Sequence, residues 1–574
     1  MKHYQLVFFI LFSLAATITY GAVVCTSSQY SSGNACADYS STTEKASALR
    51  DGSIDSGNTS WILTATVLVM LMAPATGIFY SGLYKAEHAM NTIFLSFLSL
   101  AVISTVWILF GYSFVYSSGS KGYGDFNWSV YKNLGAQPSG VYANKIPHIL
   151  YAVFQNMFAG VTPAFLSGAV VGRMKFGTYF VYITVWTLVV YNCLAHWVWG
   201  SHINPDTWLS APLGWLAIRG TIDFAGGSVI HIASGFAALA TSIFLGKRDD
   251  YRKEPVKPHN TPIAAIGMLL LWAGWFGYTG GRGGAADGIA AFAVVNTQVA
   301  GSVGMICWVI LEALIDKRAT FAGGAFGTLA GLVAITPAAG YVWPWHALIF
   351  GVFSAIFGFL FSKLKYLLRY DDPFDVFAIH GICGCVGMFM TGLFATNDVN
   401  PEVIGSAFYG YRMQLVYQLA GIAVAASFSF ACTSLILILL KLTVGIRVER
   451  TVEEMGLDRR YHGGSAYNFN DAAFEKLEKR KTSASKSEQE NYLATPVITE
   501  GRERKDEDRE IYSRITTEGN LRKDGEFKSE PHHHDPLTTE RRVVNEDVRP
   551  KTSFEQNRIE AVRRASREGL NSNN

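Results

Sequence analysis

Charged side chains are scarce over most of this 574-residue chain. Asp, Glu, Lys and Arg make up 16% of the residues, whereas hydrophobic residues make up 50%. The charges are sparse up to about Lys441 and dense afterwards, and no basic footprint typical of a nucleic-acid-binding protein is present. Low charge combined with 55 glycines excludes an ordinary soluble domain and indicates an all-α membrane protein with closely packed helices.

Cysteine is also scarce, and its positions argue against a metal centre. Of the seven cysteines, only Cys25 and Cys36 lie in the polar stretch before the first long apolar segment, where an oxidising environment would permit a disulfide. Cys383 and Cys385 lie in an apolar segment and are interpreted as packing residues. No cysteine or third histidine stands at ligand spacing from the two intramembrane histidines discussed below, so we expect no metal, no cofactor and no enzyme.

The N-terminal region has the pattern of an exported protein. Residues 1–21 combine Lys2, an apolar core and small residues, which favours a cleaved signal peptide; the alternative is a short signal anchor. Residues 22–60 are polar and are expected to be extracellular. Asn58 and Asn127 begin glycosylation sequons, and both fall on the side predicted to lie outside.

Eleven apolar segments of spanning length follow, within a predicted transmembrane domain at 61–444. Basic residues concentrate in alternate loops, which should face the cytoplasm, so the mature N-terminus is predicted outside and the C-terminus inside, as in a multi-pass protein of the plasma membrane. The segments lie near 61–83, 89–116, 149–172, 177–200, 222–246, 261–280, 287–315, 321–338, 341–363, 374–396 and 411–444.

The remaining residues, 445–574, are rich in Lys, Arg, Glu, Ser and Thr. This composition predicts a cytoplasmic tail that is largely disordered after about residue 470. Arg563-Arg-Ala-Ser566 resembles a basophilic kinase site, although such a charge run more often marks a solvated surface.

Two histidines recur in matched positions within the apolar region. Asp223-Phe-Ala-Gly-Gly-Ser-Val-Ile-His231 places an aspartate eight residues before a histidine, and Asp372 precedes His380 by the same interval. Five segments per half require the halves to be inverted relative to each other, followed by a long eleventh helix. Each histidine should then lie about 12 Å inward from its aspartate, so the two should meet near the midplane. Two imidazoles can line a path with alternating donors and acceptors; the alternative is a pair of buried core histidines.

At this point the chain resembles the Amt/Mep/Rh family of ammonium transporters, on its Amt/Mep branch, over about residues 60–470. The two histidine segments, Asp223 to His231 and Asp375-Val-Phe-Ala-Ile-His-Gly-Ile-Cys-Gly384, match the family's signatures. Supporting matches are Phe79-Tyr-Ser-Gly82, Gly111-Tyr-Ser113, Phe154-Gln-Asn-Met-Phe158, Ala195-His-Trp-Val-Trp199, Gly274-Trp-Phe-Gly277, Gly456-Leu-Asp458, His462-Gly463 and Ala466-Tyr467.

The resemblance implies a homotrimer in the lipid bilayer, with one pore through each subunit for ammonium-derived ammonia or its methylammonium analogue. His231 and His380 would be the twin histidines of that pore, and Asp372 and Asp375 would be structural acidic residues. Phe158 and Tyr278 would stack as a gate. The residues implied in recruiting ammonium are Phe154, Phe158, Trp199, Asp223, Ala225 and Gly226, with Asp223 orienting the backbone around Ala225 and Gly226.

The chain departs from the family pattern at two positions. Tyr278 stands where a second phenylalanine is usual, and Arg282 aligns with a serine that helps to bind ammonium. A fixed positive charge there repels a cation by about 1 kcal/mol at 4 Å in water. Either the glycines around Arg282 let it turn outward to solvent, or recruitment is poor. The second hypothesis for function is therefore a poorly conducting ammonium receptor that signals through its tail.

Overall fold

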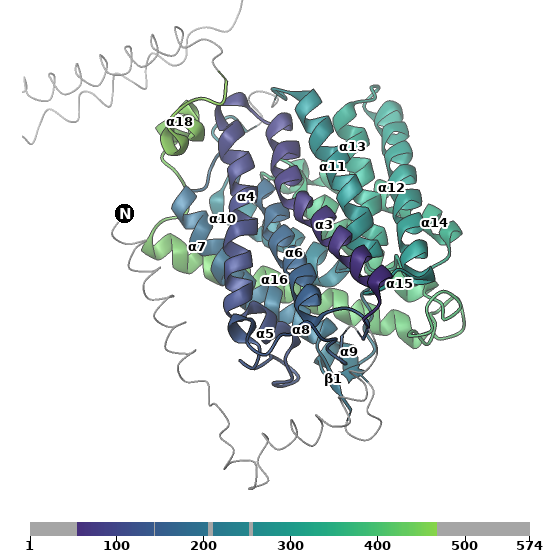
Figure 1. The fold of residues 1–574 in the computed structure, drawn as a ribbon. Coiled ribbons are helices and arrows are strands. Elements are labelled where there is room, and N and C mark those ends of the chain that lie inside the picture. Colours follow the sequence, from purple (N-terminus) through teal and green to yellow (C-terminus); the bar gives the residue numbers. More distant parts are fainter. Residues whose placement is uncertain (1–53, 143, 205–209, 252–256, 468–574) are drawn as a thin grey trace, which may run out of the picture. The chain divides into compact units, whose positions relative to one another are not determined.

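The part of the chain that the structure describes is mostly helical (Figure 1). The computed structural model describes residues 54–142, 144–204, 210–251 and 257–467. The predictions for the signal peptide, for Cys25 and Cys36, and for the tail beyond residue 470 lie outside this part of the chain.

Within the described residues, ten helical runs are long and apolar enough to cross a membrane, and an eleventh apolar helix is shorter. These match the eleven predicted segments, so the all-α membrane fold is confirmed. The ten runs are α3 (Ser56–Leu83), η2 to α5 (Ala86–Tyr116), α6 to η5 (His148–Ala169), α7 to α8 (Phe176–Trp199), η7 to α10 (Gly227–Leu245), α11 (Thr261–Gly280), α12 (Gly288–Ile315), α14 (Pro344–Leu368), η8 to α15 (Phe377–Phe394) and α16 (Met413–Thr443); the shorter helix is α13 (Phe321–Ile335).

Several of these runs are composite, because 3-10 turns begin the second run and end the third, and π-helical turns lie within or at the start of four runs. Two of the π-helical turns carry His231 and His380. The parts are η2 (Ala86–His88), α4 (Ala89–Val106), η3 (Trp107–Gly111) and α5 (Tyr112–Tyr116); α6 (His148–Leu166) and η5 (Ser167–Ala169); α7 (Phe176–Trp186), η6 (Thr187–Tyr191) and α8 (Asn192–Trp199); η7 (Gly227–Ile232) and α10 (Ala233–Leu245); and η8 (Phe377–Ile382) and α15 (Cys383–Phe394).

Polar side chains mark where several spanning helices begin. Asp55, Asn260, Asp287 and Thr320 each precede a helix, and each accepts a hydrogen bond from a backbone N–H in the first turn. Such caps satisfy N–H groups that have no partner within the helix. The change from a capping residue to an apolar run therefore sets the helix start at four places.

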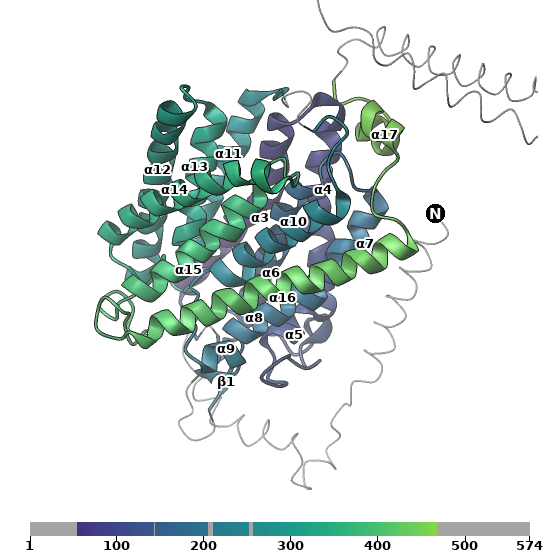
Figure 2. The same cartoon turned by 180° about the vertical axis from the view of Figure 1, so that it is seen from behind.

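The helices of the two halves pack in matching pairs. The first helix of each half, α3 and α11, lie against one another, and α10, in the fifth of the eleven segments, packs against η8 at the start of the tenth. The last helix, α16, runs across the bundle and contacts α7, α10 and α15 (Figure 2). This pairing is what two repeated halves predict, and it places a site where they meet.

Short elements cover the ends of the bundle. After α8, β1 (Ser201–Ile203) pairs with β2 (Ser210–Pro212) in a small antiparallel sheet. Two further short elements lie at the same end, η4 (Ser129–Tyr131) and α9 (Trp215–Ile218).

The segment after α16 folds back on the same chain. It forms α17 (Arg450–Met455) and α18 (Leu457–His462), and α18 packs against α4. The carboxylate of Asp458 accepts hydrogen bonds from the N–H groups of Met90 and Asn91, at 3.0 and 2.7 Å. Asp458 thus satisfies two free N–H groups at the start of α4, and its carboxylate is favourably placed at the positive end of that helix.

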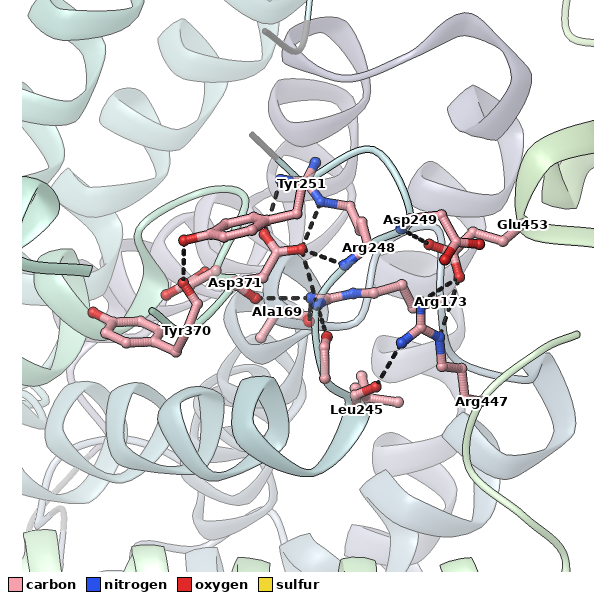
Figure 3. A network of polar contacts seen from close by, with 12 residues as sticks. Ala169, Arg173, Leu245, Arg248, Asp249, Tyr251, Tyr370, Asp371, Arg447 and Glu453 are labelled. Carbon is pink, nitrogen blue, oxygen red and sulfur yellow. Dashed lines mark hydrogen bonds and ion pairs between the residues drawn. The ribbon is translucent and has the colours of Figure 1, made fainter. Parts of the chain in front are cut away.

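A polar network ties four chain segments together at the same end of the bundle (Figure 3). Asp371 forms ion pairs with Arg173 and Arg248, at 3.4 and 2.8 Å. Arg447 pairs with Glu453 at 2.8 Å and donates to the carbonyl of Leu245 at 3.0 Å. Its charged residues Arg173, Arg248, Asp371 and Arg447 follow η5, α10, α14 and α16, and Glu453 lies in α17, so the network joins both halves to the C-terminal segment.

The Asp371 carboxylate lies in a strongly cationic environment. Burial opposes its ionisation, but Arg173 and Arg248 hold the pKa of Asp371 below its ordinary value. A lowered acid pKa adds stability at neutral pH, and this contribution is lost only as the pH falls below the ordinary aspartate pKa of about 3.9.

We therefore expect Asp371→Ala to destabilise the protein strongly, because the fully buried Arg173 would lose its counter-charge. Leaving a buried charge unpaired costs about 3–5 kcal/mol. Asp316→Ala is the control, because its partner Lys363 is largely exposed and such pairs contribute about 1 kcal/mol or less. The unfolding midpoints of the purified proteins in detergent would measure the difference; equal losses in both variants would contradict this account of the network.

Candidate functional site

The two matched histidines lie next to each other inside the bundle. Nδ1 of His231 is 3.2 Å from Nδ1 of His380, and both side chains are almost fully buried. His231 lies on the π-helical turn η7 and His380 on η8. A π turn has one residue more per turn than the surrounding α-helix, which redirects the side chains it carries and is frequent at functional sites. The structure therefore brings together the two residues that the Asp-x7-His pattern singled out.

A glycine contact allows the two histidine helices to approach so closely. A Cβ added to Gly235 would lie 2.1 Å from the backbone nitrogen of Gly381 and 2.3 Å from its Cα. Any side chain at Gly235 would therefore collide with the backbone of the opposite helix. Small residues at a membrane helix crossing allow such close packing.

Aromatic rings pack against the imidazole pair. Trp275 stacks on His231 with ring centroids 5.5 Å apart and an angle of 14°, and Phe165 stacks on His380 at 4.5 Å and 26°. The Nε2 atom of His231 is buried and has no hydrogen-bond partner in the described part of the chain. The pair is thus held through Nδ1 and by stacking, which leaves Nε2 of His231 available to a small polar molecule.

Asp223 organises the start of the first histidine helix. Its carboxylate accepts hydrogen bonds from the N–H groups of Gly226, Gly227 and Ser228 at 2.7–2.8 Å, and from the Ser228 hydroxyl at 2.6 Å. Gly226 has a φ of 111°, a left-handed conformation that favours glycine. The helix consequently begins at Gly227, five residues later than the predicted segment 222–246. The carboxylate binds backbone N–H groups, and Ala225 and Gly226 form the turn between it and the helix.

Asp372 occupies the corresponding place before the second histidine helix. Its carboxylate accepts from the N–H of Phe377 at 2.9 Å. Asp375 pairs with Lys365 at 2.8 Å, and Lys365 also donates to the Asp372 carbonyl at 3.1 Å. The helix begins at Phe377, so both acidic residues precede it, whereas the predicted segment 374–396 included Asp375. The role of Lys365 was not predicted from the sequence, because its partner Asp375 follows the turn after the end of α14.

Four aromatic residues form a continuous group close to His231. Phe158 and Tyr278 stack with centroids 4.3 Å apart and an angle of 20°. Phe154 contacts Phe158 edge-on at 5.0 Å, and Trp199 does so at 6.4 Å. Tyr278 in turn lies 6.3 Å from the His231 ring. The structure thus gathers the aromatic residues implied as recruitment site and gate, from three separate spanning runs.

Arg282 points into this aromatic group. Its guanidinium Cζ lies 4.6 Å from the centroid of the Trp199 ring. The Trp199 indole N–H donates to the carbonyl of Asp223 at 2.9 Å, which fixes the ring under the arginine. The sequence allowed Arg282 to turn outward to solvent. This expectation is wrong, because the guanidinium makes a cation–π contact with the buried Trp199.

Two further aromatic residues belong to the site although the sequence analysis assigned them no role. Trp275 stands inside the quoted motif Gly274-Trp-Phe-Gly277, one turn before Tyr278, so helical periodicity could have placed it beside the gate. Phe165 had no such signal, because its contact with His380 joins residues 215 positions apart.

These features together define a class of protein: a polytopic membrane protein whose repeated halves meet at a buried histidine pair next to a group of aromatic side chains. The ammonium transporter family model matches residues 60–467, and the chain belongs to this family. Ammonium transporter 1 of Schizosaccharomyces pombe is 40% identical over 431 residues, which cover 73% of this chain and 84% of that one.

Solved structures show the same fold. Mep2 of Candida albicans is 37% identical, with a TM-score of 0.64, over 69% of this chain and 87% of that one. A protein described as a sensor Amt protein is 27% identical, with a TM-score of 0.64, over 71% of this chain and 98% of that one.

Gly235→Ala should separate the histidine pair. Forcing a methyl group into a filled contact typically costs about 1–3 kcal/mol, and here the obstacle is backbone that cannot rotate away. We expect a lower unfolding midpoint and a loss of ammonium-dependent current. Gly288→Ala is the matched control, because nothing lies within 4 Å of an added Cβ there. A variant as stable and as active as the control would refute the role of this contact.

Tyr278→Phe tests the departure at the gate. The Tyr278 hydroxyl is buried and has no hydrogen-bond partner among the described residues, so its removal costs nothing and relieves a desolvated group. We expect the stack on Phe158 to persist, with unchanged or higher thermal stability and unimpaired current. A large loss of current in Tyr278→Phe, measured beside Tyr278→Ala, would mean instead that the hydroxyl contacts the substrate.

Proposed function

We propose that this protein conducts ammonium-derived ammonia, with or without a proton, through a pore in each subunit. The observation that carries the proposal is the buried pair of imidazoles, His231 and His380, 3.2 Å apart and close to the stacked rings of Phe158 and Tyr278. The chain's membership of the ammonium transporter family supports the choice of substrate.

The hydrogen bond within the pair determines what it offers to a substrate. One Nδ1 must donate and the other must accept, so one neutral ring keeps an unprotonated Nε2 and the other carries an Nε2–H. The pair therefore presents one acceptor and one donor. Ammonia needs both, because it donates through N–H and accepts through its lone pair.

The surroundings favour ammonia over an intact ion in the middle of the pore. A bare cation in an apolar site is very costly, and within the described residues no carboxylate hydrogen-bonds or pairs with the histidines. We infer that ammonium is recruited near Trp199 and Phe158, releases a proton, and passes the gate as ammonia. The released proton either returns to the external water or crosses separately through the imidazole pair.

The same proposal includes the setting of the protein. It is a homotrimer in the plasma membrane, with the N-terminus outside and the C-terminus in the cytoplasm; the distribution of basic loops supports this orientation. Asn58 is half-buried at the start of α3 and its side chain accepts from the N–H of Ala286, whereas Asn127 is exposed. Asn127 is thus the more accessible of the two proposed glycosylation sites. Modification of the tail by a kinase is part of the proposal.

A second candidate is a receptor that binds ammonium but conducts it poorly. Arg282 favours this reading, because its charge lies over the tryptophan implied in recruiting the substrate. The similarity to a protein described as a sensor Amt protein is compatible with it. The two candidates differ in one measurable respect: a transporter accumulates its substrate inside the cell, whereas a receptor only binds it.

Uptake of labelled methylammonium in a cell without ammonium transport is the decisive measurement. We expect accumulation with the natural chain and a fall of about tenfold or more with His231→Ala or His380→Ala, since a lost buried hydrogen bond costs about 1–3 kcal/mol. His202→Ala, in the β1–β2 hairpin, is the control and should behave like the natural chain.

Two results would count against the proposal. Binding without accumulation by the natural chain would reject transport and favour the receptor. Unaltered ammonium-dependent current in both histidine variants at equal surface expression would leave transport standing but reject the role of the imidazoles.

A further inference from the structure

The backbone around Arg282 holds the residue in place at the end of α11. The N–H of Gly281 donates to Gly277 at 2.9 Å, and the N–H of Arg282 donates to Thr279 at 3.2 Å. A Cβ added to Gly281 would lie 2.8 Å from Cζ of Phe154. The segment thus continues the last turn of the helix and packs on a residue of the aromatic group, so the inward direction of Arg282 is built into the fold.

The guanidinium covers the indole that the substrate would need. Trp199 is only 7% exposed, its N–H is committed to the Asp223 carbonyl, and Arg282 lies 4.6 Å above its ring. Phe158 meets the same indole at 89°. Little of the aromatic face remains for a second cation while the arginine is there.

The surroundings of the Arg282 guanidinium resemble a binding site for a small cation. Among the described residues it forms no ion pair, and its Nε is buried without a hydrogen-bond partner. The guanidinium instead lies over the Trp199 ring and near the Tyr151 hydroxyl. The nearby Asp223 carboxylate is taken up by three N–H groups and a hydroxyl. Aromatic faces are groups that recognise small organic cations.

We propose that Arg282 is a tethered cation that occupies the outer aromatic site from within, so that external ammonium binds only in competition with its guanidinium. This inference rests on the proposed transport function and names the residue that sets its concentration dependence. Without the arginine, the outer aromatic site should bind free guanidinium and similar small cations.

The test compares full-length variants in the same transport-deficient cell. For Arg282→Ser and Arg282→Gln we expect the ammonium concentration at half-maximal current to fall about tenfold or more, with the maximal current changed less than about twofold, because the competitor acts on binding and not on passage. Arg282→Lys keeps a cation and should stay near the natural value. Arg219→Ser is the matched control, because Arg219 also covers a tryptophan, Trp215, at 5.7 Å, but outside the aromatic group.

Guanidinium chloride supplies a second readout that a merely structural arginine would not change. We expect free guanidinium to inhibit Arg282→Ser competitively, and the natural chain and Arg282→Lys far less, with potassium chloride at equal ionic strength as the reference. An unchanged half-maximal concentration in both Arg282→Ser and Arg282→Gln, together with equal guanidinium sensitivity in all variants, would overturn the proposal. Should Arg282→Ser fail to fold, as judged by its unfolding midpoint, Arg282→Gln decides.

Failure of this inference can be separated from failure of the transport proposal. If the natural chain accumulates no methylammonium, calorimetric titration of the purified proteins with guanidinium replaces the current. Tighter binding by Arg282→Ser than by the natural chain would then support the tethered cation in a receptor. Equal binding would reject it.

Discussion

The close crossing of the two histidine helices is the constraint on which the site depends. Side chains of ordinary size keep helix axes about 8–10 Å apart. At Gly235 and Gly381 the backbones touch instead, and the rings of His231 and His380 reach hydrogen-bond distance. The π turns η7 and η8 lie at this crossing and carry the two rings. A site that recognises a molecule as small as ammonia needs such proximity, since a longer gap would admit water between the rings.

A second constraint follows from the membrane, which cannot hydrogen-bond to polar groups. Charged residues are therefore satisfied within the protein, and they gather at the ends of the helices. Asp223 caps one helix start, Asp372 another, and Asp371 pairs with two arginines where four segments meet. The middle of the described bundle holds the imidazole pair between aromatic rings. In the proposed function this distribution separates an outer region that binds a cation from an interior that passes a neutral molecule or a relayed proton.

The sequence predicted the spans and the histidine pair well, for physical reasons. The bilayer determines the hydropathy of the spans and the spacing of the basic loops, and a duplicated fold explains the repeated Asp-x7-His interval. The helix starts at Gly227 and Phe377 were placed too early, because capping turns before them are as apolar in composition as the helices. The direction of Arg282 could not be predicted, since glycines permit many directions and contacts with Phe154 and Trp199 select one. The pairing of Lys365 with Asp375 also depends on tertiary structure.

The position of Arg282 separates its effect from that of the histidines. In the proposed function the tethered charge acts on entry, because the stacked rings of Phe158 and Tyr278 lie between it and the histidine pair. The imidazole pair would act beyond those rings, on a molecule that has already lost its charge. Cation binding would then depend on Trp199 and Arg282, and passage on His231 and His380, two groups that are far apart in the sequence. A change at Arg282 would therefore alter the response to external ammonium without changing the histidine pair.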